Sequence, residues 1–447
     1  MRRSAFTTVI ILVEVLIALS ATADTPRGLP PPRWHVSISP LFSKHPEDTR
    51  ITSVSDVILV SHYPAVIAVN RTSGRELWRR GESDSDSANL PRTTIGWQLL
   101  SSGSVDGVGP VALLLEIRGI TKADSTFPSG QHSVADYSEV ALNANTGQVL
   151  WSSPSDVYCK STLVGNLVVN INHVEAPGKV KTLLYRDAAA GAALDAADTH
   201  GAAAIQRAVR HQGKDSVLIG DLTALWSLNI ATGTATNLHN ATGYLLNYWA
   251  FPDQQRVVMH NNADDDVPGQ STFPKYVECV DLTGAVQWSF PKDLEFISAD
   301  KIATIPELYS IFPMTPCRAC CTVLCVNDKV GRNGRFSWYG LDVRYGKVLW
   351  KSAIVDEPPV IAECGAGFLV VAYRDTARGK VNLEWMDGQT GKLARIGPAP
   401  DAAMMAVDGS DLFVVATDGK LSAYPLETLL PAAAKKRLAA VTRRSSN

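Results

Sequence analysis

The sequence lacks an excess of charge of either sign. Its 447 residues include 42 Lys and Arg against 44 Asp and Glu, which gives a formal net charge of −2. A chain this balanced has no overall field that would attract nucleic acid or an anionic membrane surface, and it contains no visible basic stripe. We therefore expect no nucleic-acid partner.

The sequence also lacks the short motifs that mark common catalytic sites. It contains no G-x-S-x-G nucleophile motif, no Ser/His/Asp set and no glycine-rich phosphate-binding loop. Its nine histidines are scattered without the spacing of a metal site. These absences favour a non-enzymatic protein, with no catalytic residue and no bound metal.

Long apolar runs are missing beyond the N-terminal segment. There, two arginines precede an apolar run from Val9 to Leu19, and the tripeptide Ala-Thr-Ala at 21–23 is a typical cleavage signal. The run is shorter than the ~20 residues that a membrane-spanning helix needs. We therefore predict a cleaved signal peptide at 1–23, a proline-rich linker at 24–33, and an extracytoplasmic protein of the secretory pathway without a transmembrane segment.

One phrase recurs along the rest of the chain. An alternating apolar strand ends in Asn or Asp, a short turn leads to a glycine, and a tryptophan often stands four residues later, as in VIAVNRTSGRELW and EVALNANTGQVLW. An Asn or Asp side chain can close such a turn onto its own backbone, glycine accepts the positive φ, and the tryptophan can pack against a neighbouring copy. The tryptophans of these copies are Trp78, Trp151, Trp288 and Trp350, and the glycines are Gly74, Gly147, Gly191, Gly233, Gly284, Gly346 and Gly391.

The spacing of these glycines predicts the architecture. Successive glycines lie 73, 44, 42, 51, 62 and 45 residues apart, and the shorter gaps match a four-stranded propeller blade of ~40–45 residues. An eroded copy near residue 424 makes eight units but lacks a fourth strand, which the orphan strand PRWHVSISP, with Trp34, would supply. We predict an all-β fold: one eight-bladed β-propeller of four-stranded antiparallel blades over residues 34–431, closed by the N-terminal strand.

Two further expectations concern the ring and its tail. A seven-bladed ring is the alternative, because the copy AAAGAALD is rich in alanine and lacks the tryptophan. Residues 432–447 are basic and short, and we expect a flexible solvated tail there. We expect the protein to be a monomer.

The phrase of strand, Asx, turn, glycine and Leu-Trp, repeated around a ring, resembles the pyrroloquinoline quinone (PQQ)-type repeat of the quinoprotein alcohol dehydrogenase-like superfamily. The resemblance covers nearly all of the predicted mature chain. One branch of that superfamily binds PQQ and calcium at the propeller axis and oxidises alcohols or sugars. Another branch is non-catalytic and organises protein partners, as does the bacterial lipoprotein of the outer-membrane β-barrel assembly machinery.

No motif in this chain matches the calcium ligands or the catalytic Asp of the quinoprotein branch. We therefore expect an exported, non-enzymatic scaffold that binds protein partners or a ligand through its loops and central funnel, without a cofactor. A dehydrogenase that uses PQQ and calcium is the alternative. Within the second unit, the polar stretches GESDSDSANLPRTT and GITKADSTFPSGQHSVAD are predicted to be exposed, mobile partner-binding insertions, and simple tolerated insertions are the alternative.

Four of the seven cysteines fall within the segment CRACCTVLC. An adjacent pair resembles the disulfide that lies against the quinone in many quinoprotein alcohol dehydrogenases, but here it stands in the sixth unit rather than early in the ring. A zinc site would need a second Cys or His pair, and thiols in an oxidising compartment form disulfides instead. Cys317 is expected to pair with Cys320 or Cys321, and Cys325 with Cys279 or Cys364, with the connectivity left open.

Two Asn-x-Thr sequons mark candidate glycosylation sites. They begin at Asn70 and Asn240. Asn70 is also the first Asx residue of the recurring phrase, so one residue carries both expectations.

Overall fold

The computed structural model describes only part of the chain. The described residues are 29–38, 49–81, 95–123, 131–155, 161–172, 182–198, 207–210, 216–220, 224–229, 234–241, 244–251, 255–262, 275–290, 307–313, 323–330, 335–351, 359–365, 368–375, 380–388, 390–399, 402–408, 410–430 and 435. The predicted signal peptide, all but one residue of the predicted tail, Gly233 and the cysteines at 317, 320 and 321 lie outside them.

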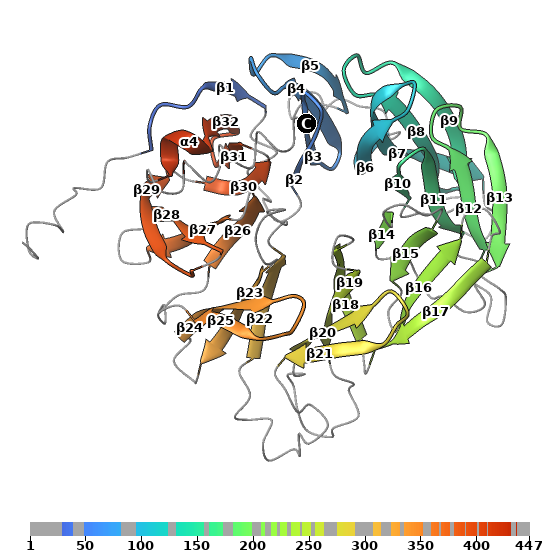
Figure 1. Cartoon of the computed structure of the whole chain (residues 1–447). Helices are drawn as coiled ribbons and strands as arrows, with labels where there is room; N and C mark the ends of the chain where they lie inside the picture. Colours follow the sequence, from blue (N-terminus) through green and yellow to red (C-terminus); the bar gives the residue numbers. More distant parts are fainter. Residues whose placement is uncertain are drawn as a thin grey trace, which may run out of the picture.

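The described residues form eight four-stranded antiparallel sheets, which stand around a common centre (Figure 1). In seven sheets the strands follow chain order, with the first strand nearest the centre and the fourth at the rim. These sheets are β2 (Arg50–Val54), β3 (Val57–His62), β4 (Ala65–Asn70) and β5 (Glu76–Arg80); β6 (Ile95–Val105), β7 (Gly109–Ala123), β8 (Gln131–Asn143) and β9 (Val149–Ser155); β10 (Thr162–Val164), β11 (Leu167–Asn172), β12 (Thr182–Asp187) and β13 (Ala193–Asp198); β14 (Arg207–Arg210), β15 (Ser216–Gly220), β16 (Ala224–Asn229) and β17 (Thr234–Asn240); β18 (Tyr244–Phe251), β19 (Arg256–Asn262), β20 (Lys275–Asp281) and β21 (Val286–Phe290); β22 (Glu307–Pro313), β23 (Val323–Val330), β24 (Arg335–Asp342) and β25 (Val348–Lys351); β26 (Pro359–Gly365), β27 (Phe368–Asp375), β28 (Lys380–Asp387) and β29 (Leu393–Ala399).

The eighth sheet joins the two ends of the propeller. It contains β30 (Ala402–Asp408), β31 (Asp411–Ala416) and β32 (Lys420–Pro425), and its outermost strand is β1 (Trp34–Ser37). β1 pairs antiparallel with β32, with Trp34 opposite Ala423. The all-β propeller class is as predicted, and so is its closure by the N-terminal strand, which covers the edge of β32 and joins the two ends of the ring. A short helix, α4 (Leu426–Leu429), follows β32, and no helix among the described residues has the length and apolar character needed to cross a membrane.

The core lies between neighbouring sheets. Successive side chains of a strand point to opposite faces of its sheet, so each inner strand packs against the sheet on either side of it. In β3 and β4, Ile58 and Ile67 pack toward the last sheet, whereas Leu59 and Val66 pack toward the sheet of β6–β9. All four side chains are fully buried. Inner strands covered on both faces need apolar residues at every position, which explains runs such as VILV and AVIAV.

Each turn of the recurring phrase that lies within the described residues is closed by its own Asx side chain. In the first copy, Oδ1 of Asn70 accepts hydrogen bonds from the backbone N–H groups of Thr72 (3.2 Å) and Ser73 (2.9 Å). The backbone N–H of Gly74 donates to the Asn70 carbonyl at 2.9 Å, and Gly74 has a φ of +71°. The same side-chain acceptor recurs at Asn143, Asp187, Asp281, Asp342 and Asp387.

Tryptophans connect five of the described turns to the sheet before them. In five places, the Nε1–H of a tryptophan on one sheet donates a hydrogen bond of 2.6–2.9 Å to a backbone carbonyl in the turn of the next sheet. The accepting carbonyl belongs to the residue that directly follows the Asx of that turn. Four of these tryptophans lie in the outer strands β5, β9, β21 and β25. In each of these strands a β-bulge lies just before the tryptophan and turns its ring toward the next sheet. The indoles are those of Trp34, Trp78, Trp151, Trp288 and Trp350. The repeat therefore encodes contacts between sheets.

Candidate functional site

A cavity of about 380 Å³ lies beside the propeller axis. The first strands of three sheets, β2, β6 and β30, supply its lining, and β2 contacts both of the other two strands. Its apolar walls come from Ile51, Leu99, Leu100 and Met404. Its volume falls in the range of about 300–1,000 Å³ that is typical of ligand pockets in proteins.

The polar part of this cavity contains hydroxyl groups and one positive charge. Thr52, Ser101 and Ser102 supply the hydroxyls, and Oγ1 of Thr52 lies 3.5 Å from Oγ of Ser102. Arg50, the first residue of β2, is exposed at the cavity and forms no ion pair within the described part of the chain. The cavity therefore combines apolar walls, hydroxyls and an unpaired guanidinium.

These lining groups do not fit the calcium–quinone site of the quinoprotein branch. Calcium prefers six to eight oxygen ligands, with carboxylates prominent among them. None of the residues that line this cavity carries a carboxylate, and Arg50 would repel a divalent cation. Elsewhere in the described ranges, no group of three or more His, Cys, Asp and Glu side chains is close enough to hold a metal ion.

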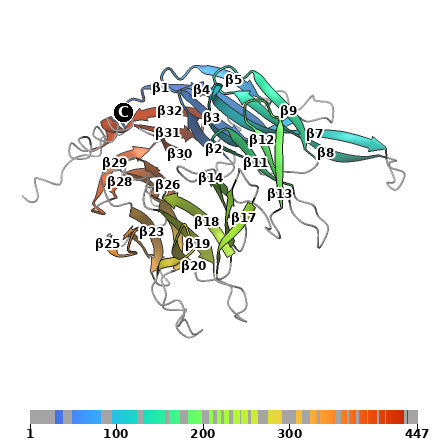
Figure 2. The ribbon, with the colours of Figure 1, turned by 45° about the vertical axis from the view of Figure 1, so that its right-hand side comes forward.

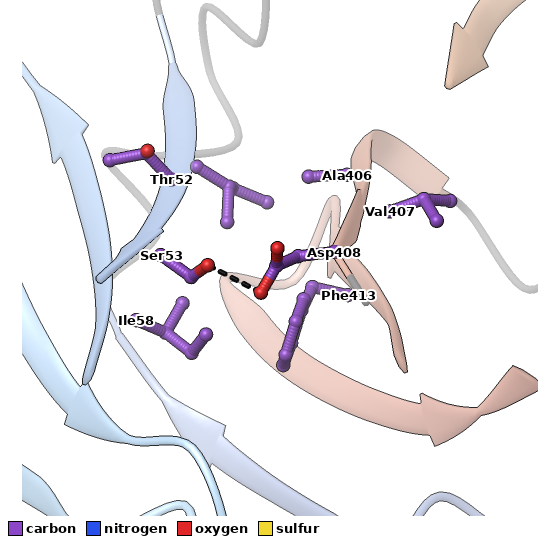
Figure 3. A pocket seen from close by; sticks show the side chains of 8 residues that line it. Thr52, Ser53, Ile58, Ala406, Val407, Asp408 and Phe413 are labelled. Carbon is purple, nitrogen blue, oxygen red and sulfur yellow. Dashed lines mark hydrogen bonds between the residues drawn. The ribbon is translucent and has the colours of Figure 1, made fainter. Parts of the chain in front are cut away.

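A second cavity, of about 180 Å³, adjoins the first, and Ile51 and Thr52 line both. Figure 3 shows Asp408 of β30 facing Ser53 of β2 across it, with Ile58 below Ser53 and Phe413 below Asp408 in this view. The Ser53 hydroxyl donates a hydrogen bond to the Asp408 carboxylate. This contact joins the first and last sheets of the chain.

An ion-pair cluster continues this junction. Arg71, in the turn after β4, approaches Asp408 at 2.6 Å and Asp411 at 3.1 Å, and its guanidinium lies 5.9 Å from the centre of the Phe413 ring. Arg33, just before β1, binds the other Asp411 oxygen at 2.7 Å. Asp411 is only 2% exposed, so its two arginine partners balance a charge that has lost most of its hydration.

The hairpin β7–β8 projects beyond its own sheet (Figure 2). β6 pairs with β7 only up to Arg118, and β9 pairs with β8 only from Tyr137 onward. Within the described residues, 119–123 and 131–135 therefore pair only with each other. We call this two-stranded part the ribbon.

The ribbon corrects one expectation from the sequence. The stretch 119–136 was predicted as a mobile insertion, yet its described residues are strand, because the hairpin register of β7 and β8 continues through them. Ile120 stands opposite Val134, and Lys122 stands opposite His132. Of the other predicted insertion, at 81–94, only Gly81 is described.

The cysteines are placed in part. Cys279 of β20 has a free thiol, so its predicted alternative pairing with Cys325 is not formed. Burial raises the pKa of this thiol to about 12, which keeps it protonated and unreactive. Cys325 lies in β23, in the sheet after that of Cys279, and Cys364 lies in β26.

Both sequon asparagines lie at strand ends. Asn70 ends β4, and its Oδ1 is already an acceptor in the Asx turn. Asn240 ends β17, is exposed, and accepts a hydrogen bond of 2.7 Å from Nδ2 of Asn237. Glycosylation of either stays a prediction.

A histidine–carboxylate pair bridges two sheets away from the axis. His239 Nε2 in β17 lies 2.8 Å from Glu278 Oε2 in β20. The hydrogen bond to Glu278 raises the pKa of His239 above its ordinary value of 6.5, against the opposing effect of burial, and the Glu278 charge and the Gly284 backbone raise it further. The protonated pair therefore stabilises the contact between these sheets.

This pair predicts a pH-dependent stability. Because the folded-state pKa is raised, the stabilisation is fully present below about pH 6.5 and is lost as pH rises through the folded-state value. The difference in unfolding free energy between wild type and His239→Gln is expected to be larger at about pH 6 than at about pH 9. Denaturant titrations at both pH values measure it. Glu278→Gln is expected to remove the same pH dependence, and an equal difference at both pH values would contradict the assignment.

Comparison with solved structures supports the fold. The chain is similar to BamB from Moraxella catarrhalis, with a TM-score of 0.50 and 13% identity over 88% of this chain and 98% of that one. It is also similar to the dihydro-heme d1 dehydrogenase NirN in complex with DHE, with a TM-score of 0.50 and 17% identity over 93% of this chain and 82% of that one. No protein-family model and no curated protein matches the sequence. At these identities the likeness shows a β-propeller fold and leaves the activity open.

Sequence reasoning missed the residues of the axial cavity. Arg50 and Thr52 stand in the first strand of the first unit, and Ser101 and Ser102 stand in the first strand of the second. First strands lie nearest the centre of the ring, so the first strands of the predicted units are the part of the sequence in which axial residues could have been sought. The charged residues of the sheet junction carry no such signal, because Arg71 and Asp408 are 337 positions apart.

Proposed function

We propose that this protein is an exported, non-enzymatic propeller that binds a protein partner, with the ribbon as the main contact surface. It would then be a non-catalytic member of the PQQ-type propellers. The observation that carries the proposal is the ribbon itself, a segment whose strands leave their own sheet and project from the ring.

The physical argument starts from stability. An isolated two-stranded hairpin is marginally stable at best in water, because its outer edges and faces lack neighbours. The ribbon has no third strand within the described residues. A partner that adds a strand, or covers one face, would satisfy backbone groups that the ring leaves open. The rigid sheet of β6–β9 holds the base of the ribbon, which suits a contact arm better than a loose loop.

The lining of the axial cavity supports a non-enzymatic role. Its hydroxyls, apolar walls and single guanidinium offer neither a nucleophile–base pair nor a set of metal ligands. The N-terminal segment, which has the features of a signal peptide, supports export.

Site-specific photo-crosslinking tests the proposal. A photoreactive residue at Thr121 or Ser133, on opposite strands of the ribbon, is expected to capture the same partner in cells that produce the protein. The same residue at Arg344, exposed on the sheet of β22–β25, is the control and is expected to capture nothing reproducible.

A shortened protein provides the second arm of this test. Replacing 119–135 with an Asn-Gly turn should keep the fold while abolishing the crosslinked partner. Capture at Arg344 alone, or dye reduction after addition of PQQ and calcium, would overturn the proposal. Thermal unfolding of the shortened protein shows that the ring itself survives the change.

A further inference from the structure

The axial cavity has a chemistry that the ribbon does not explain. We propose that it binds a peptide segment in which a carboxylate stands next to an apolar side chain. The inference rests on the proposed protein-binding role and names the chemistry of one segment that such a partner would insert. The combination of Arg50 with three hydroxyls and four apolar side chains carries it.

The charge at the cavity has no carboxylate partner among the described residues. Other arginines nearby have carboxylate partners: Arg71 binds Asp408 and Asp411, and Arg118 binds Glu116. Arg50 forms no ion pair with any described residue. The nearest acid in the adjoining cavity, Asp408, already accepts hydrogen bonds from Arg71 and Ser53.

A carboxylate is the group that this arrangement recognises. A guanidinium binds a carboxylate through charge-assisted hydrogen bonds, often two in parallel. The hydroxyls of Thr52, Ser101 and Ser102 can donate to the remaining lone pairs. A cationic ligand would be repelled by Arg50. A nucleic acid is a poor fit, because its phosphates would make no favourable contact with the apolar walls and Arg50 is the only basic residue among those that line the cavity.

The apolar walls require a second feature in the ligand. Leu99, Leu100 and Met404 stabilise a complex only when they cover apolar surface that would otherwise face water. A small free acid would leave them without such a partner. The adjoining cavity shares Ile51 and Thr52, so an extended chain could set successive side chains into both cavities. These features favour a peptide over a single small anion.

Peptide selection tests this inference. A display library of short random peptides is selected against the immobilised wild-type protein, Arg50→Glu, Arg50→Lys and the matched control Arg344→Glu. Arg344 is also exposed and without an ion pair in the described part of the chain, but it lies in the turn after β24 and does not line the cavity. Wild type and Arg344→Glu are expected to enrich sequences with Asp or Glu beside Leu, Ile, Met or Phe. Arg50→Glu is expected to lose this enrichment.

Fluorescence anisotropy with one enriched peptide gives the magnitude. Arg50→Glu is expected to weaken binding about tenfold or more, and Arg50→Lys by less, because an ammonium keeps the charge but loses the planar fork. The affinities of one peptide with a free C-terminal carboxylate and with a C-terminal amide are then compared. A weaker affinity of the amide shows that the C-terminal carboxylate is bound, whereas equal affinities indicate an internal Asp or Glu. Circular dichroism and thermal unfolding show that each variant is folded.

The outcomes separate this inference from the ribbon. No enrichment, enrichment without acidic residues, or equal binding by Arg50→Glu would overturn the cavity assignment and leave the crosslinking result untouched. If no partner is crosslinked at Thr121 while peptides still bind, the ribbon is not the contact surface, and the assignment of the cavity as a peptide-binding site stands. Enrichment of acidic–apolar peptides that depends on Arg50 supports the inference.

Discussion

Deletion of residues 29–38 is expected to abolish the cooperative unfolding of the whole ring. The deletion removes β1, exposes the edge of β32 and takes away Trp34 (8% exposed) and Ile38 (1% exposed). Truncating a buried Trp to Ala typically costs ~3–5 kcal/mol and a buried Ile ~2–5 kcal/mol. Their sum alone approaches the 5–15 kcal/mol that a folded domain usually has. Guanidinium unfolding, followed by tryptophan fluorescence and far-UV circular dichroism, measures the loss.

A milder variant keeps this prediction testable if the deletion does not fold. Trp34→Ala keeps the strand but removes the ring that packs near Phe413 and the hydrogen bond of 2.8 Å to the Arg71 carbonyl. Trp288→Ala removes an equivalent tryptophan from an internal junction of the ring. Both are expected to lose ~3–5 kcal/mol, but only Trp34→Ala should speed proteolysis of the N-terminal segment. Equal proteolysis of the two variants would contradict a closing role for β1.

Gly147→Ala is expected to destabilise the protein by about 3–5 kcal/mol. Gly147 has a φ of +69°, and a methyl group there would lie 2.7 Å from the Trp78 ring. An L-residue at such a φ costs roughly 1–2 kcal/mol. Displacing Trp78 also weakens its hydrogen bond of 2.6 Å to the Ala144 carbonyl and its packing between sheets. Denaturant titration of the variant measures the total.

Gly107→Ala is the matched control for this substitution. Gly107 has a φ of +76°, but a methyl group there meets no atom within 4 Å. Its cost is expected to be the backbone strain alone, roughly 1–2 kcal/mol. The difference between the two variants isolates the contact between tryptophan and turn. Equal losses would show that the tryptophan moves aside without cost.

The sequence predicted the parts of the fold whose chemistry is local and repeated. The turn at Asn70–Gly74 is determined by neighbouring residues, since the Asx acceptor and the positive φ of glycine lie within one phrase. The repetition of this phrase then predicted the four-stranded sheets and the fold class. The last unit lacked a fourth strand, and this gap predicted that the N-terminal strand with Trp34 closes the ring. The sequence also predicted that each tryptophan of the phrase packs against a neighbouring copy, whereas the turn carbonyl that its Nε1 binds became visible only in the structure.

The candidate sites could not be predicted to the same degree. Arg50 becomes notable only once β2, β6 and β30 stand together, and no local pattern says which of their residues face one cavity. The ribbon was missed because the polar composition of 119–136 resembles a loop, whereas the hairpin register sets its backbone as strand. The pairing of Arg33 with Asp411 spans 378 positions, and charge alone does not identify a partner at that distance.

The position of β1 has a consequence for how the protein is made. Among the described strands, β1 is synthesised first and its partner β32 last, so β1 must wait while about 380 residues are translated. At the usual pace of synthesis this delay is on the order of tens of seconds, far longer than hairpins need to form. During that interval Trp34 and Ile38 have no sheet to cover them, and β30–β32 cannot be completed. Completion of the ring therefore requires that β30–β32 have been translated.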